Sequence, residues 1–244
     1  LTPDVEIPLL GFGTYLIAND EVAAPVAEAI AAGYRHIDTA EAYQNESGVG
    51  AGIKQALESE SLKRSDIFVT TKLYPGNPAW GQDAKDAEAT VKSLEESLKR
   101  LGLDYVDLYL IHAPFGGDQR VAQWRALVEL KRQGKVRAIG VSNFDIQHIE
   151  ELKAAGLPLP DANQIELHPW SQKPELVRYL EEKGITAIAY SSLVPLSTWR
   201  IAEGQDSAKT DQMKADGEQA GAPFKVMAEK YGVSEAQVLL HWAV

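Results

Sequence analysis

Apolar residues along the chain fall into short runs that alternate with longer segments of helical periodicity. Seven runs rich in β-branched and aromatic residues predict strands at 7–13, 36–39, 67–73, 106–112, 136–143, 163–168 and 186–191. Apolar positions three or four residues apart predict helices at 21–32, 87–101, 121–133, 146–155 and 175–183. A glycine follows most of these helical segments, as expected where a helix ends.

Strands that alternate with helices predict a parallel sheet covered on both faces. An open doubly wound sheet usually has a glycine-rich turn after its first strand, whereas "GFGTY" has two glycines and lacks the third. We therefore predict an α/β fold in which the parallel sheet closes into a barrel. No linker or change of composition divides the chain, so residues 1–244 are expected to form one domain. The long polar segment 197–222 is typical of a lid or a mobile loop.

The composition narrows the class of protein. The 244 residues include 24 Lys and Arg against 35 Asp and Glu, and the net charge of −11 argues against nucleic-acid or polybasic membrane partners. The chain has no cysteine, which excludes disulfides and thiolate chemistry. It also has no apolar run of membrane-spanning length and no signal-like start. We expect a soluble, cytoplasmic protein.

Polar side chains close three consecutive predicted strands. Asp38, Lys72 and His112 hold these positions, and Tyr43 follows in the loop after the second strand. Each alone has an ordinary structural interpretation, such as a loop cap, a surface lysine, a core imidazole or a rim aromatic. Together they indicate a site, because the carboxyl ends of barrel strands carry the chemistry and a buried Asp or Lys needs a partner.

Three kinds of chemistry could use this group of residues. A metal site is disfavoured, because the five histidines lack ligand spacing and a lysine lies among the candidates. A Schiff-base role for Lys72 needs a depressed pKa, which a neighbouring Asp38 opposes. Proton donation by Tyr43 to a carbonyl oxygen is the third, with Lys72 lowering the phenol pKa and His112 orienting the substrate. Such a reaction needs a hydride source and so implies a nicotinamide.

At this point the sequence resembles the aldo-keto reductases. The resemblance runs through nearly all of the chain and rests on the ordered motifs "LLGFGTY", "GYRHIDTAEAYQNE", "VTTKL", "LYLIHAP", "GKVRAIGVSNF", "NQIELHPW" and "AIAYSSL". It implies a (β/α)8 TIM barrel that reduces aldehydes and ketones to alcohols with NADPH, less often NADH, as an alcohol dehydrogenase (NADP+) or carbonyl reductase. It also implies a catalytic tetrad of Asp38, Tyr43, Lys72 and His112, with Tyr43 as the general acid.

The resemblance further implies a cofactor site and a substrate pocket. Ser142, Asn143 and Gln164 are expected to bind the nicotinamide carboxamide, Tyr190 to stack on the ring, Ser191 and Leu193 to meet the pyrophosphate, and Thr14 to lie at the nicotinamide end. The expected pocket residues are Tyr15, Tyr74, Ala113 and Trp199. Ala113 stands where the family often has Trp, which should open one wall of the pocket. The segment after Lys72 looks longer than usual, and Trp80 is expected at the pocket rim.

The end of the sequence departs from the family pattern. An eighth strand and helix are absent from the 244 residues, and with them the residues that grip the adenosine phosphate. We expect the missing segment to exist in the protein, because a gap in the barrel would expose strand edges. The expected partner is a small carbonyl compound and the expected state a monomer. The alternatives are a cofactor-binding regulatory or structural protein on the same fold and, more remotely, a lysine-dependent aldolase.

Overall fold

The computed structural model describes residues 1–196 and 223–244 of the chain. Within these ranges the residues group into two compact units. The first comprises Leu1–Asn163 and Tyr179–Thr186, and the second comprises Gln164–Arg178 and the described residues from Ala187 to Val244. The segment 197–222, which the sequence marks as a loop and which contains Trp199, lies outside the described residues.

The first unit is built on a parallel sheet. Its strands are β1 (Phe12–Gly13), β2 (His36–Asp38), β3 (Phe68–Leu73), β4 (Val106–Ile111) and β5 (Val136–Ser142), each paired in parallel with the next. The sheet order follows the chain from β1 to β7, and β6 (Ala162–Glu166) and β7 (Thr186–Tyr190) both begin in this unit. Every residue of β3 and β4 is buried, as expected for parallel strands covered on both faces.

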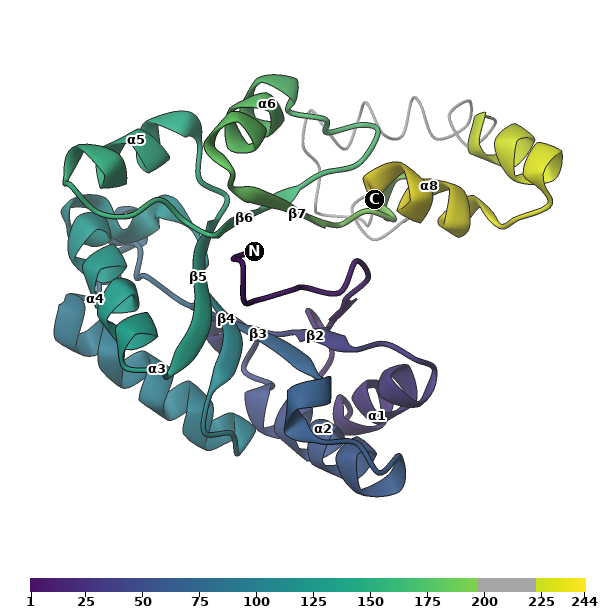
Figure 1. Ribbon diagram of the computed structural model, residues 1–244, viewed down its shortest axis with the longest axis horizontal. Helices are drawn as coiled ribbons and strands as arrows, with labels where there is room; N and C mark the ends of the chain where they lie inside the picture. The colour runs from purple at the N-terminus through teal and green to yellow at the C-terminus, as the bar shows by residue number, and fades with distance from the viewer. Residues whose placement is uncertain (197–222) are drawn as a thin grey trace. The chain divides into compact units, whose positions relative to one another are not determined.

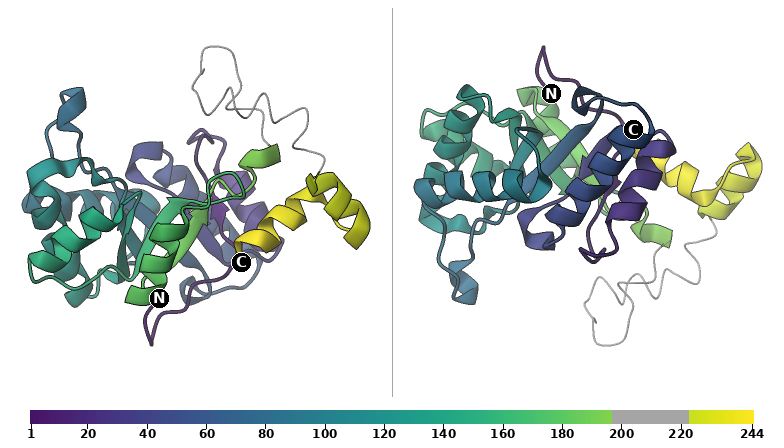
Figure 2. Two further views of the ribbon diagram at one scale, coloured as in Figure 1. Left: turned by 90° about the horizontal axis from the view of Figure 1, so that it is seen from above. Right: turned by 90° about the horizontal axis from the view of Figure 1, so that it is seen from below.

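Five helices of the first unit lie outside the curving strands (Figure 1). They are α1 (Ala23–Ala31), α2 (Glu46–Ser59), α3 (Ala87–Leu101), α4 (Arg120–Arg132) and α5 (Ile146–Ala154). Helices α1 and α2 pack side by side, as the view from below in Figure 2 shows. Helix α3 starts at a capping Asp86 and ends at Gly102, whose φ of 67° suits a glycine.

Helix α2 is a helix that the apolar pattern did not predict. Its sequence "ESGVGAGIKQALES" has glycines at alternate positions, which disfavour a helix by intrinsic propensity. The structure shows why they are there. A Cβ at Gly48 would lie 2.1 Å from the carbonyl oxygen of Asn19, and one at Gly50 would lie 2.2 Å from that of Leu101. The glycines therefore allow α2 to pack closely on its neighbours.

The second unit contains the end of β6, the rest of β7, the start of α6 (Pro174–Lys183) and α8 (Glu235–Ala243). Residues 223–231 are also helical. The two strands are linked past their ends, where the Leu167 amide donates to the Tyr190 carbonyl at 3.3 Å. Helix α8 begins with a capping box formed by Ser234 and Gln237.

The predicted strands and helices are all present, and apart from β1 their ends agree with the prediction within two residues. The first strand was predicted over 7–13, whereas β1 covers only Phe12–Gly13. Pro8 has no amide hydrogen for strand pairing, and Leu9 and Leu10 are exposed rather than packed under helices. The apolar residues of this segment had suggested a longer buried strand.

Candidate active site

Three polar residues lie at the carboxyl ends of adjacent strands in the first unit. Asp38 ends β2, Lys72 is the penultimate residue of β3, and His112 directly follows β4. The parallel register keeps these ends level, since the His112 amide donates to the Leu73 carbonyl at 3.0 Å. The short helix η1 (Glu41–Tyr43) follows β2 and brings Tyr43 to the same place. The structure thus brings together the four residues predicted as a tetrad.

Lys72 is the centre of this group. Its side chain is fully buried, and Nζ donates to the Asp38 carboxylate, to the Thr39 carbonyl at 2.9 Å and to the Tyr43 hydroxyl at 3.3 Å. Burial alone would lower the pKa of Lys72, but Asp38 and Tyr43 outweigh it, so the pKa is raised. The lysine is therefore an ammonium at neutral pH, which argues against a Schiff-base role.

The pKa of Tyr43 reflects two opposing effects. Burial raises it, whereas the positive charge of Lys72 lowers it, and the net result is a pKa above the usual value of a tyrosine. The sequence had suggested that Lys72 would lower the pKa, and this contribution is present but smaller than the effect of burial. The phenol consequently keeps its proton at neutral pH while a cation stands beside its oxygen.

His112 is neutral at this site. Burial and the nearby Lys72 charge lower its pKa to about 4. Its ring centroid lies 5.5 Å from that of Tyr43, nearly perpendicular to it. Its Nδ1 is buried and has no hydrogen-bond partner within residues 1–196 and 223–244. A neutral imidazole in this position can donate a hydrogen bond to a substrate oxygen.

Asn45 holds the turn that carries Tyr43, a role that the strand-end pattern did not reveal. This fully buried side chain donates to the carbonyls of Thr14 and Ile17 at 2.8 and 3.0 Å and accepts from the Thr39 hydroxyl at 2.9 Å. Thr14, predicted near the nicotinamide, is itself buried and donates its hydroxyl to the Asp38 carbonyl at 3.1 Å. In the sequence, the only sign of this role is that Asn45 lies two residues after Tyr43, in the motif "YQNE".

The predicted cofactor residues occur in both units. In the first unit, Ser142 is buried at the end of β5, and the amide of Asn143 donates to the Ser142 hydroxyl and the His112 carbonyl, both at 3.1 Å. In the second, Gln164 is buried, Tyr190 ends β7, Ser191 has a left-handed φ of 58°, and Leu193 is partly exposed. In the first unit, the Ser142 hydroxyl and the Asn143 amide supply both donors and acceptors, which fits the carboxamide of a nicotinamide.

Of the aromatic residues predicted for the pocket, Tyr15 contacts Tyr43. The ring of Tyr15 lies 5.0 Å from that of Tyr43, and the Tyr74 hydroxyl donates to the side chain of Gln82. Trp80 is 71% exposed and its ring lies 5.8 Å from that of Phe115. Trp80 thus pairs with an aromatic residue that follows β4. Ala113, directly after His112, is buried and adds little bulk.

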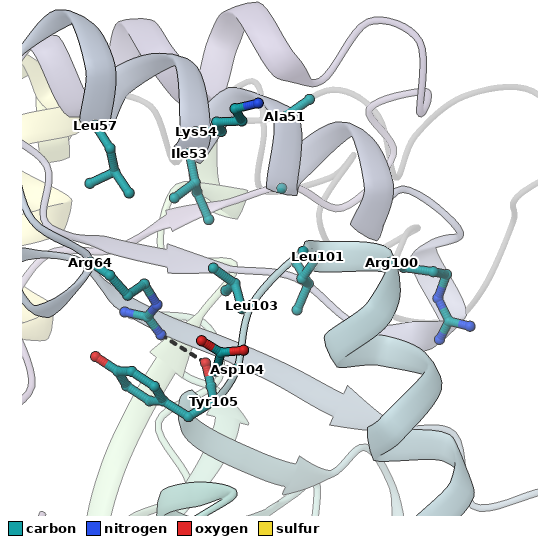
Figure 3. A pocket seen from close by; sticks show the side chains of 12 residues that line it. Ala51, Ile53, Lys54, Leu57, Arg64, Arg100, Leu101, Leu103, Asp104 and Tyr105 are labelled. Carbon is teal, nitrogen blue, oxygen red and sulfur yellow. Dashed lines mark hydrogen bonds between the residues drawn. The ribbon is translucent and has the colours of Figure 1, made fainter.

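A separate cavity of about 410 Å³ lies between α2 and the segment that follows α3 (Figure 3). Its walls are largely aliphatic, from residues such as Ile53, Leu57 and Leu103. The Arg64 guanidinium at its edge donates to the Tyr105 carbonyl at 3.1 Å and pairs with Asp107 at 2.8 Å. This arginine is committed to structural contacts, and the cavity contains none of the predicted site residues.

Two further features bear on the class of site. Residues 1–196 and 223–244 contain no group of three or more His, Cys, Asp or Glu side chains that could hold a metal ion. None of the helices in the described part of the chain combines the length and the apolar character needed to cross a membrane.

Comparisons with known proteins give a consistent result. The family model described as "Aldo/keto reductase family" matches residues 9–244. A glyoxal reductase of Bacillus subtilis is 40% identical over 241 residues, which cover 98% of this chain and 75% of the relative. An aldo/keto reductase structure from Brucella melitensis is 41% identical, with a TM-score of 0.78, and the match covers 97% of this chain and 79% of that one. The Bombyx mori aldo-keto reductase in complex with NADP is 34% identical with a TM-score of 0.78, covering 96% and 75%.

Proposed function

This chain belongs to the aldo/keto reductase family, and we propose that Tyr43 is the proton donor with which it reduces small aldehydes. The protein is an NADPH-dependent oxidoreductase that converts aldehydes and ketones to alcohols. The observation that carries the proposal for Tyr43 is the fully buried Lys72 ammonium, held between the Asp38 carboxylate and the Tyr43 hydroxyl.

Tyr43 has the properties of a general acid for this reaction. Negative charge develops on the carbonyl oxygen as the carbonyl carbon is reduced, and a phenol within hydrogen-bond reach can transfer its proton to that oxygen. The raised pKa of Tyr43 keeps the proton in place before the reaction. The phenolate left afterwards is stabilised by the Lys72 ammonium, whose Nζ lies 3.3 Å from the oxygen.

Asp38 and His112 have supporting roles. Asp38 pairs with Lys72 and keeps it charged, because burial alone would lower the lysine pKa. His112 is neutral and can donate a hydrogen bond to the same substrate oxygen, which orients the carbonyl toward Tyr43. A neutral donor suits this position, since a second buried cation beside Lys72 would be repelled.

NADPH, when bound, supplies the hydride. We propose that Ser142, Asn143 and Gln164 hold its carboxamide and that Tyr190 packs on its ring. The left-handed backbone at Asn143 and at Ser191, with φ of 60° and 58°, places sharp turns after β5 and β7. Ser191 and Leu193 are proposed to meet the pyrophosphate, and Thr14 to shape the nicotinamide end.

The proposed substrates include dicarbonyls of the glyoxal type, which the similar Bacillus subtilis enzyme is named for. Ala113, the residue after His112, has a small side chain where the family often has Trp, and we propose that bulkier aldehydes fit as well. We propose Tyr15, Tyr74 and Ala113 as pocket residues, whereas Trp199, the fourth residue predicted for the pocket, lies outside the described residues. We also propose that the enzyme is of the alcohol dehydrogenase (NADP+) or carbonyl reductase type.

The experiment is a comparison of the protein with its Tyr43→Phe variant. Turnover is followed by the loss of NADPH absorbance with glyoxal, methylglyoxal and a small aromatic aldehyde. The variant keeps the ring and loses the proton, and loss of a general acid lowers kcat by about 10²–10⁴-fold. NADPH affinity should change little. A variant with wild-type kcat would rule out Tyr43 as the acid.

A further inference from the structure

Glu41 connects the turn that carries Tyr43 to the segment after β3. It is the first residue of η1, two positions before Tyr43. Its Oε2 accepts a hydrogen bond from the Tyr74 amide at 2.9 Å, and its Oε1 accepts one from Lys85 Nζ at 2.6 Å. One carboxylate therefore bridges the two ends of the segment 74–85.

Lys85 is a fixed anchor for this carboxylate. Its Nζ also donates to the Ser93 hydroxyl at 2.7 Å, which ties it to α3. Its backbone amide donates to the Pro75 carbonyl at 3.0 Å, and its carbonyl accepts from the Gln123 amide at 2.8 Å. The Gln123 amide also donates to the Pro75 carbonyl at 2.9 Å. The two ends of the 74–85 segment are thus held by hydrogen bonds to η1, α3 and α4.

The 74–85 segment carries two aromatic residues that sequence analysis expected in or beside the substrate pocket. Tyr74 stands at its start, and Trp80 pairs with Phe115 at a ring distance of 5.8 Å. Tyr43 stands at the end of the turn that Glu41 begins. The Glu41 carboxylate therefore joins the turn that ends at Tyr43 to the segment that begins at Tyr74.

We propose that Glu41 and Lys85 are positioning residues. They fix the position of the Tyr43 hydroxyl relative to the 74–85 segment, as the reaction requires. The inference rests on the proposed reductase function. Tyr43 has other supports, namely Lys72 and its own amide bond to the Ala40 carbonyl at 3.0 Å. Loss of Glu41 should therefore misplace the acid without removing it, so activity falls but is not abolished.

The test uses Glu41→Ala, Glu41→Gln and Lys85→Met with a matched control. The control is Lys131→Met, since Lys131 on α4 pairs with Asp161 at 2.7 Å and is also partly exposed. Small misplacements of reacting groups cost about tenfold to a hundredfold in rate, so kcat/KM should fall by roughly this factor in Glu41→Ala and in Lys85→Met. Glu41→Gln should lose less, because its amide oxygen can still accept from the Tyr74 amide.

Two further measurements separate positioning from simple destabilisation. The isotope effect on kcat, measured with NADPH that carries deuterium in place of the transferred hydride, should rise in Glu41→Ala. The reason is that the chemical step becomes slower relative to product release. The affinity for NADPH should stay within about twofold, since the side-chain hydrogen bonds of Glu41 and Lys85 join Tyr74, Ser93 and each other, none of which is a proposed cofactor residue. Lys131→Met should keep the wild-type rate and isotope effect, whatever its midpoint of unfolding.

Each outcome has a defined meaning. If Glu41→Ala and Lys85→Met keep the wild-type kcat/KM and isotope effect, the pair is structural only and the proposal is wrong. If the wild type reduces no aldehyde, the proposed function fails, and amide exchange then decides the positioning role alone. The Tyr43 and Tyr74 amides should exchange faster in Glu41→Ala than in Lys131→Met, and equal rates would overturn the inference.

Discussion

The buried pair of Asp38 and Lys72 leads to a prediction about stability and activity together. Lys72 is completely buried and the Asp38 side chain is only 14% exposed. In Lys72→Met the carboxylate loses its counter-ion, and in Asp38→Asn the ammonium does. Removal of one member of a buried ion pair costs about 3–5 kcal/mol, so each single variant should lose roughly this much free energy of unfolding.

The double variant Asp38→Asn, Lys72→Met should be more stable than either single variant. It leaves no buried charge, and the remaining loss comes from polar groups such as the Thr39 carbonyl, which no longer receives the 2.9 Å bond from Nζ. An unsatisfied buried group costs about 1–3 kcal/mol. The sum of the two single losses should therefore exceed the loss in the double variant by several kcal/mol.

The assay is urea unfolding followed by tryptophan fluorescence, combined with NADPH-dependent turnover. All three variants should be nearly inactive, including the more stable double variant, because each disrupts the cation beside Tyr43. Losses of stability that simply add in the double variant would show that the two side chains do not act as a buried pair. Recovery of activity in the double variant would refute the role given to Lys72.

The single variant Asp38→Asn has a distinctive dependence on pH. In the wild type the Lys72 pKa is raised, so the stability from this lysine is complete below the unfolded pKa and is lost only as pH rises through the folded value. Without Asp38, the effect of burial is no longer offset and the lysine pKa falls. The unfolded state then binds more protons than the folded state between the lowered folded pKa and the usual lysine pKa, so the stability of the variant should rise with pH through this range, unlike that of the wild type.

Three further predictions concern the pocket, the pH profile and the helices. A His112 pKa of about 4 means that kcat/KM should show no histidine ionisation between pH 5 and 8, and a break near 6.5 that disappears in His112→Gln would contradict this. Ala113→Trp adds bulk beside His112, so kcat/KM for a bulky aromatic aldehyde should fall by more than that for glyoxal, which a two-substrate assay measures. Gly50→Ala should destabilise the protein by about 1–3 kcal/mol, because the new Cβ would lie 2.2 Å from the Leu101 carbonyl oxygen and this overpacking outweighs the better helix propensity of alanine. An unchanged midpoint of urea unfolding would contradict the close packing.

The sequence predicted those parts of the fold and site that follow from local pattern. Apolar runs marked the strands, and the polar residue at the end of each strand located Asp38, Lys72 and His112. The glycine-rich α2 was not predicted, because its stability comes from packing against distant segments and contradicts its own propensity. Glu41 and Lys85 were also missed, since they meet across 44 residues and form no motif. The net pKa of Tyr43 depends on its burial, which no strand-end pattern contains.

The glycines of α2 have a consequence for the order in which the protein assembles. Gly48, Gly50 and Gly52 make this helix poorer than an alanine-based one by about 1 kcal/mol each, so it should not persist as an isolated segment. We expect it to form together with α1 and the end of α3, against which its glycines pack. Asn45, just before its first residue, holds the Tyr43 turn through Thr14, and Glu46 accepts hydrogen bonds from Thr71 and Arg100. We therefore expect the proton donor to reach its place only as this side of the sheet folds, so that a partly folded chain would lack a working acid.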